Sequence, residues 1–233
     1  MIKKIFNFSG NQEGIKEEDI NSTIYRKINR ILAVKSAKWL ARHTTITPNQ
    51  ITIIPLLLYI LTAYLFYLAS YPALIAGGIV FLLSYFMDQL NGSLARIKGM
   101  ANDFGRWLDG VSDTFGLALI YFGATLGLSI KTDMPYVWLF GFLSVTSYLF
   151  GNWLYVTYNM IFSFSTHEIE SIKKKRSFMR NFFYNGNFII LMFALAGFLN
   201  KMYWLLAFFS VYGWIYCFAI AFGLTKSIAK HYR

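Results

Sequence analysis

The chain has 233 residues, of which 56% are hydrophobic and 19% aromatic, and it carries a formal net charge of +11. This apolar content is above that of an ordinary soluble domain and favours a membrane protein with several spanning helices. The cations lie between apolar runs and leave no soluble basic domain, which argues against nucleic acid as a partner. The single Cys217 excludes an intramolecular disulfide framework, and we interpret it as a small buried side chain.

The first 43 residues are predicted to form a cytoplasmic segment that ends in an amphipathic helix. Five apolar residues of this helix can share one face: Ile28, Ile31, Leu32, Trp39 and Leu40. Lys and Arg residues fill much of the remaining surface. The pattern is typical of a helix in the lipid headgroup region with its cations toward anionic lipid. A solvated basic linker is the alternative.

Six apolar runs follow and are predicted to span the membrane as helices. They lie at about 51–68, 73–90, 103–127, 136–162, 186–199 and 203–224. Thr47 before Pro48 predicts the start of the first, since Thr caps exposed amides and Pro is tolerated in a first turn. The fifth run is short, so its helix could begin as early as Phe182. Gly123 and Gly127 have the spacing of an interhelical contact, for which packing within the chain is the simpler use.

The basic residues orient these helices, because cytoplasmic loops collect Lys and Arg. With six spans, all Lys and Arg residues except Lys131 and Lys201 fall on one side. Both termini are therefore expected in the cytoplasm, with the protein integral to the cell membrane. The predicted fold is an all-α integral membrane protein of six transmembrane helices with an N-terminal amphipathic interfacial helix. Its domain is expected at 44–225, followed by a basic tail at 226–233.

One stretch between the second and third runs places acids at the ends of apolar helices, where an ionised side chain is costly. It reads DQLNGSLARIKGMANDFGRWLDGVSD, from residue 88 to residue 113. Asp109 and Asp113 are four residues apart and share a helical face, while Asp88 and Asn91 are three apart on the preceding helix. Carboxylate and amide oxygens without Cys or His suggest Mg²⁺, Mn²⁺ or Ca²⁺. Such ions commonly serve phosphoryl transfer.

Two other interpretations of the acids remain open from the residues alone. The acids could pair with Arg96 and Arg106 in a structural network at the membrane surface. They could also belong to a proton- or cation-coupled transporter. Confinement of the acids to one helical hairpin disfavours the transporter.

The acidic stretch resembles the signature of the CDP-alcohol phosphotransferase family, D-x-x-D-G-x-x-A-R-x8-G-x3-D-x3-D. It matches every specified position except residue 91, where Asn91 replaces the second Asp. The segment TPNQIT at 47–52 also resembles the one that opens the first membrane helix in that family. Six helices with an amphipathic N-terminal helix are the family's architecture, in agreement with the elements predicted above.

The resemblance implies an enzyme of phospholipid or polar-lipid synthesis. The family transfers a phosphoalcohol from a CDP-linked donor, commonly CDP-diacylglycerol, to an acceptor hydroxyl and releases CMP. It implies that Asp88 and Asp109 are ligands shared by two Mg²⁺ or Mn²⁺ ions, and that Asp113 is both a ligand and the general base. The residues implied for the nucleotide pocket are Gly92, Ala95, Arg96 and Gly105, with Asn49 at its wall. The resemblance also implies a homodimer.

Asn91 is the departure from the family pattern. Its carbonyl oxygen can still ligate a hard cation, but one negative charge is lost, and binding of at least one metal ion should weaken. Three interpretations follow: an active enzyme with altered metal affinity, an active enzyme with an altered donor, or a catalytically degenerate member that binds nucleotide or lipid without turnover.

The acceptor is unknown from the sequence. Arg176 and Arg180, in a basic run that starts at Lys173, could hold an acceptor phosphate such as that of glycerol phosphate or inositol phosphate. Anchoring on anionic lipid is the alternative use of this run. The segment YRKINR before TPNQIT resembles members that use inositol-containing substrates, without naming a product.

Overall fold

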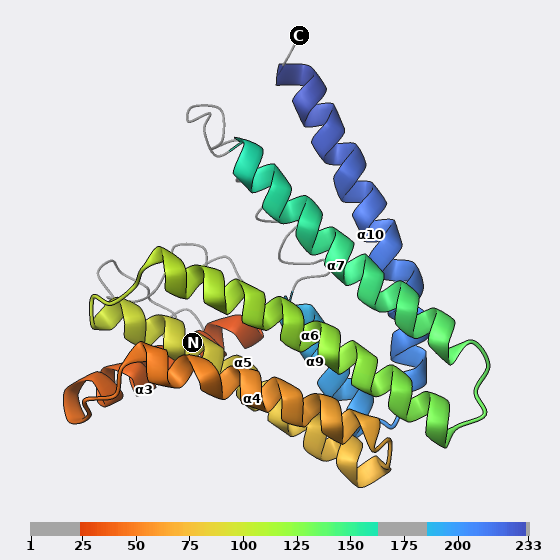
Figure 1. The fold of residues 1–233 in the computed structure, drawn as a ribbon, viewed down its shortest axis with the longest axis horizontal. Coiled ribbons are helices and arrows are strands. Elements are labelled where there is room, and N and C mark those ends of the chain that lie inside the picture. Colours follow the sequence, from red (N-terminus) through yellow and green to blue (C-terminus); the bar gives the residue numbers. More distant parts are fainter. Residues whose placement is uncertain (1–23, 163–185, 232–233) are drawn as a thin grey trace, which may run out of the picture. The chain divides into compact units, whose positions relative to one another are not determined.

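The computed structural model describes residues 24–162 and 186–231. Every regular element within these two ranges is an α-helix (Figure 1). The helices are α3 (Ile24–His43), α4 (Pro48–Tyr67), α5 (Tyr71–Ile97), α6 (Asp103–Lys131), α7 (Val137–Phe162), α9 (Gly186–Phe198) and α10 (Met202–His231). The predicted all-α fold class is confirmed.

Five of the described helices, α4, α5, α6, α7 and α10, are long and apolar enough to cross a membrane. The fifth predicted span corresponds to α9, which has 13 residues. At 1.5 Å per residue it measures about 20 Å, against a hydrocarbon core of about 30 Å. The expected start at Phe182 lies outside the described residues. Six spans therefore stay a prediction, of which five are present as candidate spans.

The chain divides into two compact units. The first contains residues 1–55 and Ser84–Gly110, and the second contains Leu56–Leu83 and residues 111–233. Helices α4, α5 and α6 each contribute one segment to each unit. Asp88, Asn91 and Asp109 consequently belong to the first unit, and Asp113 belongs to the second.

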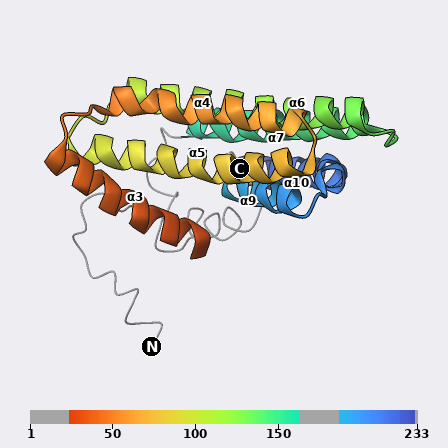
Figure 2. The same ribbon diagram turned by 90° about the horizontal axis from the view of Figure 1, so that it is seen from below.

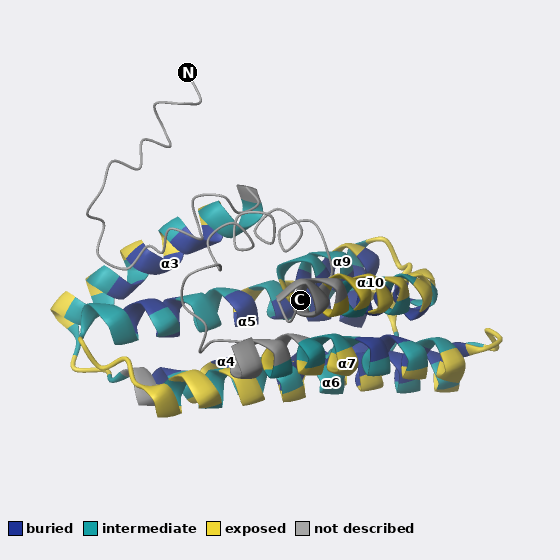
Figure 3. Ribbon diagram, turned by 90° about the horizontal axis from the view of Figure 1, so that it is seen from above, coloured by how far each residue is buried: buried dark blue, intermediate teal, exposed yellow. Residues whose placement is uncertain are grey.

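In the first unit, α3 packs on α5 through small side chains. Ala33 and Ala37 are fully buried, in one cluster with Leu90 and Leu94 of α5 and with Ile51 of α4. Figure 2 shows α3 beside this part of α5, and Figure 3 shows buried positions recurring along α3. Alanine side chains let the two helices approach closely while the leucines fill the space between them.

The other side of α3 exposes large apolar residues. Ile28, Leu32 and Trp39 are each about half exposed or more. Leu40, expected on the same face, packs instead against the buried cluster. Residues Ile24–His43 form a helix, whereas its amphipathic character and its place at a membrane interface stay predictions.

The start of α4 is the one predicted. Pro48 is its first residue, and the Gln50 side chain reaches back so that its Oε1 accepts a hydrogen bond from the Thr47 backbone N at 2.9 Å. This is one half of a capping box, in which the third helical residue satisfies the amide of the capping residue. The cap fixes where the polar TPNQIT segment enters the helix.

The end of α5 differs from the prediction. The second predicted span was expected to end near Leu90, but the helix continues to Ile97. Two residues beyond its end Gly99 has φ +66°, and the Met100 N donates to the Ala95 O at 2.8 Å. This is a common way for a helix to end, because glycine adopts the left-handed backbone conformation without strain. Burial of Leu90 and Leu94 against α3 explains the continuation, because it offsets the cost of glycine inside a helix.

In the second unit, α6 packs closely on α4. A Cβ at Gly123 would collide with the backbone of Ala63, and one at Gly127 would lie 2.6 Å from the Phe66 O. The predicted use of these glycines for packing within the chain is confirmed. Cys217 is fully buried, as predicted, and its thiol donates to the Ser147 O at 3.2 Å.

Candidate metal and nucleotide site

Helical spacing brings three of the predicted ligands together in the first unit. Asp88 and Asn91 lie one turn apart on α5, and Asp109 lies on α6. The Asn91 Nδ2 donates to the Asp109 Oδ1 at 3.4 Å and to the Thr52 Oγ1 of α4 at 3.0 Å. Three helices therefore meet at Asn91, and the predicted convergence of α5 and α6 is present at this residue.

The two polar atoms of the Asn91 side chain have different surroundings. Its residue is 4% exposed, its Nδ2 makes the two hydrogen bonds above, and its Oδ1 is buried without a hydrogen-bond partner among the described residues. A buried acceptor left unsatisfied is costly, and such atoms often face an ion or ligand. Beside two carboxylates, this oxygen fits a hard divalent cation.

The candidate metal ligands within the first unit are few. No group of three His, Cys, Asp or Glu side chains suited to a metal occurs in the described parts of the chain. Asp88 and Asp109 supply two carboxylates and Asn91 supplies an amide oxygen. Mg²⁺ usually keeps several waters or substrate oxygens, so a partial protein set of this kind is compatible with it.

Asp88 is held by a chain of hydrogen bonds that begins on α3. The Gln89 Nε2 donates to the Asp88 Oδ2 at 3.1 Å, and the Arg30 Nη1 donates to the Gln89 Oε1 at 2.9 Å. A guanidinium only donates and a carboxylate only accepts, so together they fix the orientation of the Gln89 amide. Arg30 and Gln89 were not predicted from the sequence, because Arg30 was placed among the cations facing lipid and Gln89 carries no charge.

The residues implied for the nucleotide pocket lie on α5 and α6. Arg96 extends over Gly92, where a Cβ would lie 3.7 Å from the Arg96 Nη1. Ala95 is half-buried on the same helix. Asn49 lies in the first turn of α4, and its side chain is outside what the structure describes. Arg176 and Arg180 also lie outside the described residues.

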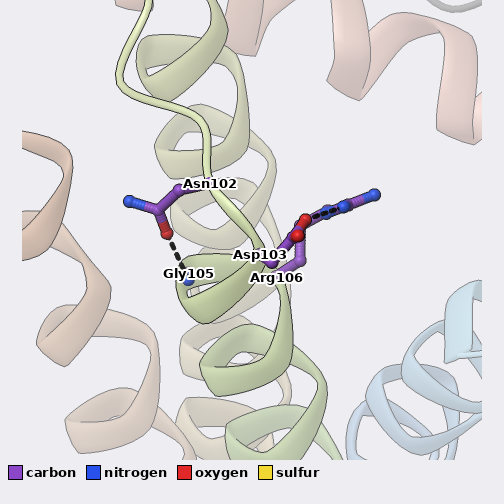
Figure 4. A network of polar contacts seen from close by, with 4 residues as sticks. All are labelled: Asn102, Asp103, Gly105 and Arg106. Carbon is purple, nitrogen blue, oxygen red and sulfur yellow. Dashed lines mark hydrogen bonds and ion pairs between the residues drawn. The ribbon is translucent and has the colours of Figure 1, made fainter.

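Gly105 takes part in the cap of α6. The Asn102 Oδ1 accepts a hydrogen bond from the Gly105 N at 2.7 Å, and a Cβ at Gly105 would lie 3.3 Å from that oxygen (Figure 4). Arg106, one residue further, forms an ion pair with the exposed Asp103. This contact gives Arg106 a partner other than the signature acids, which weakens the interpretation of a structural network built on it.

The linker before α4 is tied to the end of α5. The Lys98 Nζ donates to the Ile46 O at 2.6 Å and to the Thr44 O at 3.2 Å. A charged donor to two carbonyls makes strong hydrogen bonds. These contacts hold the linker just ahead of the helix that supplies Thr52.

Asp113 lies one turn after Asp109 on α6, in the second unit. Its Oδ1 accepts a hydrogen bond from the Tyr59 Oη of α4 at 3.0 Å. The adjacent Thr114 Oγ1 accepts from the Asn152 Nδ2 of α7 at 2.8 Å. Tyr59 was not predicted from the sequence. A tyrosine inside an apolar helix could have indicated it, because a buried phenol hydroxyl usually has a hydrogen-bond partner.

Comparison with known families decides the classification. Residues 45–225, which include the whole acidic stretch, match the family described as CDP-alcohol phosphatidyltransferase. The chain belongs to this family. The family predicted from the signature is therefore confirmed, with Asn91 as the departure within a CDP-alcohol phosphatidyltransferase sequence.

Two similar proteins have curated names. Archaetidylinositol phosphate synthase of Pyrococcus horikoshii is 41% identical over 96 residues, which cover 41% of this chain and 50% of that protein. A bifunctional IPC transferase and DIPP synthase of Aquifex aeolicus is 33% identical over 128 residues, or 53% of this chain and 28% of that protein. The chain thus spans half or less of the length of these relatives.

Solved structures resemble the fold. A crystal structure of Mycobacterium tuberculosis phosphatidylinositol phosphate synthase with CDP-DAG bound superposes with a TM-score of 0.65 at 16% identity, covering 83% of this chain and 94% of that one. A second structure of that protein, in complex with manganese and citrate, gives a TM-score of 0.64 at 16% identity, covering 82% of this chain and 88% of that one. At this identity the likeness concerns the fold, and it agrees with an all-helical CDP-alcohol phosphatidyltransferase domain.

Proposed function

We propose that this protein transfers a phosphoalcohol group, such as phosphatidyl, from a CDP-linked lipid donor to an acceptor hydroxyl and releases CMP. The observation that carries the proposal is the meeting of Asp88, Asn91 and Asp109 in the first unit, in the register of the family signature. The M. tuberculosis relative was crystallised with CDP-DAG, which supports a donor of this class.

The proposed metal ligands are Asp88, Asn91, Asp109 and Asp113, with two Mg²⁺ or Mn²⁺ ions. Bound ions would neutralise the donor's diphosphate and stabilise the departing phosphate. The buried Asn91 Oδ1 and the oxygen-only ligand set support this assignment. The manganese complex of the M. tuberculosis relative supports it as well.

In the proposed reaction Asp113 is the catalytic base. Its carboxylate takes the proton of the acceptor hydroxyl while the acceptor oxygen forms a bond to the donor's β-phosphorus. The bond from that phosphorus to the oxygen bridging the two phosphates breaks, and CMP leaves with the electron pair. Removal of the proton is needed because a neutral alcohol is a poor nucleophile.

We propose that the cytidine diphosphate lies against Gly92, Ala95, Arg96 and Gly105, with Asn49 at its edge. Gly92 keeps the helix surface open below the Arg96 guanidinium. A guanidinium forms paired hydrogen bonds with phosphate, which suits Arg96 for the diphosphate.

For the acceptor we propose a polyol that carries a phosphate, such as inositol phosphate. The names of the P. horikoshii and M. tuberculosis relatives, both of which contain inositol phosphate, support this class. Arg176 and Arg180 are the proposed contacts for its phosphate.

We propose that the protein lies in the cell membrane with six spans and both termini in the cytoplasm. The domain at 44–225 would lie between an N-terminal segment and a basic tail, and the proposed assembly is a homodimer.

The test is CMP release by the purified full chain in detergent, with CDP-diacylglycerol and a panel of polyol phosphates. CMP should form with Mg²⁺ or Mn²⁺ and should be lost with EDTA. Asp113→Asn should abolish it while the purified variant still unfolds in a single cooperative thermal transition. No CMP with any donor, acceptor or metal would reject the proposed transfer.

A further inference from the structure

We propose that Tyr59 is a positioning residue for Asp113, holding its carboxylate in the orientation in which it accepts the acceptor's proton. The inference rests on the proposed function and deepens it. Tyr59 lies outside the signature, which runs from Asp88 to Asp113, and it takes no part in the reaction steps proposed above.

The contact is direct and lies within one unit. The Tyr59 Oη donates to the Asp113 Oδ1 at 3.0 Å, and Tyr59 is 2% exposed. A hydrogen bond from a neutral hydroxyl to a carboxylate is stronger than one between neutral groups. Since it is made to one oxygen of Asp113, the bond also fixes the rotation of the carboxylate, and with it the direction of the second oxygen.

The α6 backbone is shaped to admit the tyrosine ring. Gly116 lies three residues after Asp113, and a Cβ there would approach the Tyr59 Cγ to 2.6 Å and its Cβ to 2.9 Å. These distances are shorter than any van der Waals contact, so the ring occupies space that only glycine leaves open. The ring position in turn determines where the hydroxyl lies.

Neighbouring contacts hold the ring and the helix. Phe81 of α5, fully buried, meets the Tyr59 ring edge-on with centroids 6.1 Å apart. On α6 the Asn152 side chain binds Thr114, directly after Asp113. Both sides of the Tyr59–Asp113 contact are therefore fixed by other helices of the same unit.

Packing alone would be satisfied by phenylalanine. The buried hydroxyl requires a partner, and a hydrogen bond to the Asp113 carboxylate is more specific than apolar packing needs. The geometry therefore assigns the hydroxyl to the carboxylate rather than to the core.

The test compares the purified full chain with its Tyr59→Phe variant, which keeps the ring and removes the hydroxyl. The kcat for CMP release should fall roughly 10- to 100-fold, the usual loss when a partner orienting a functional carboxylate is removed. The KM for CDP-diacylglycerol should be unchanged, because the hydroxyl is proposed to act on the base. Tyr121→Phe, at a fully buried tyrosine of the same unit, is the matched control and should keep the wild-type kcat.

A second variant, Gly116→Ala, keeps the hydroxyl but displaces the ring, and it should lower kcat in the same way. Tyr59→Phe and Asp113→Asn should also lower the melting temperature less than additively, as expected for two groups that bond to each other. Undiminished kcat in both Tyr59→Phe and Gly116→Ala would overturn the inference and leave the proposed function intact. If the wild type releases no CMP but the melting temperatures of the two variants are non-additive, the proposed function is rejected while the Tyr59–Asp113 hydrogen bond is retained.

Discussion

Asn91 occupies the position at which the family signature has an aspartate, and its amide gives that position a donor as well as an acceptor. The Nδ2 hydrogen bonds to Asp109 and Thr52 would not exist with a carboxylate, which only accepts. In the absence of metal, asparagine thus links α4, α5 and α6 where aspartate would add repulsion. At the proposed metal site the missing charge would lower the attraction for a divalent ion, so we expect asparagine to stabilise the metal-free protein at the expense of metal affinity.

We predict that Asn91→Asp tightens Mn²⁺ binding by at least about tenfold, equivalent to about 1.4 kcal/mol. The added charge increases the carboxylate count of the site, which raises affinity for divalent ions. In EDTA the same variant should melt at a lower temperature, because the introduced carboxylate and that of Asp109 would repel each other. Electron paramagnetic resonance of Mn²⁺ and thermal unfolding measure the two effects.

The control for Asn91→Asp is Asn200→Asp, which adds the same charge in the turn between α9 and α10. It should leave Mn²⁺ affinity unchanged. Equal metal affinity in the wild type and Asn91→Asp would mean that residue 91 is not a ligand.

For a second residue near the acids, we predict that Gln89→Leu lowers the free energy of unfolding by about 1.5–3 kcal/mol. The substitution removes a hydrogen bond from the buried Arg30 guanidinium and another to Asp88. Arg30→Met/Gln89→Leu should lose less stability than the sum of the single variants, since the first change removes the charge that the second leaves undersatisfied. Denaturant unfolding of the four proteins tests this, and strict additivity would contradict the coupling.

At the scale of helices, the glycines of α6 have different surroundings. Gly123 lies against the backbone of α4, whereas a Cβ at Gly110 would meet no atom within 4 Å. We predict that Gly123→Ala lowers the free energy of unfolding by about 1–3 kcal/mol through overpacking. Gly110→Ala should raise it by up to about 1 kcal/mol through helix propensity. Thermal unfolding of both variants provides the measurement, and a loss of equal size at the two positions would argue against close packing at Gly123.

The helices and the site were predictable to different extents. The spacing of Asp88 and Asn91 predicted that they share a face of one helix, and the short connection to the next helix predicted that Asp109 lies near them. The extension of α5 to Ile97 could not be predicted from local propensity, since it depends on burial against α3. Arg30 and Tyr59 act across 59 and 54 residues of sequence. Contacts at such separation depend on how the helices pack, which no local pattern encodes.

For the molecule as a whole, the orientation in the membrane depends on whether α9 crosses it. If it does, Lys201 lies on the same side as the α4–α5 turn; if it does not, Lys201 lies on the side of the α5–α6 connection. We predict that Lys201→Cys and Ser70→Cys, in a Cys217→Ala background, are both labelled in intact cells by a thiol reagent that cannot cross membranes.

Ala101→Cys, in the connection between α5 and α6, is the control and should be labelled after the membrane is broken. Ser70, Ala101 and Lys201 are all exposed. Labelling of Ser70→Cys without Lys201→Cys in intact cells would place α9 outside the set of spanning helices.

The packing of α3 sets a practical limit on how the domain can be excised or recombined. The family match begins at residue 45, yet Ala33 and Ala37 cover the side of α5 that carries Leu90 and Leu94, and Arg30 reaches toward Asp88 through Gln89. A fragment or chimaera that begins at residue 45 would expose Leu90 and Leu94. It would also lack the Arg30 guanidinium that holds Gln89 beside Asp88. Boundaries for such fragments therefore belong before Ile24, where the helix begins.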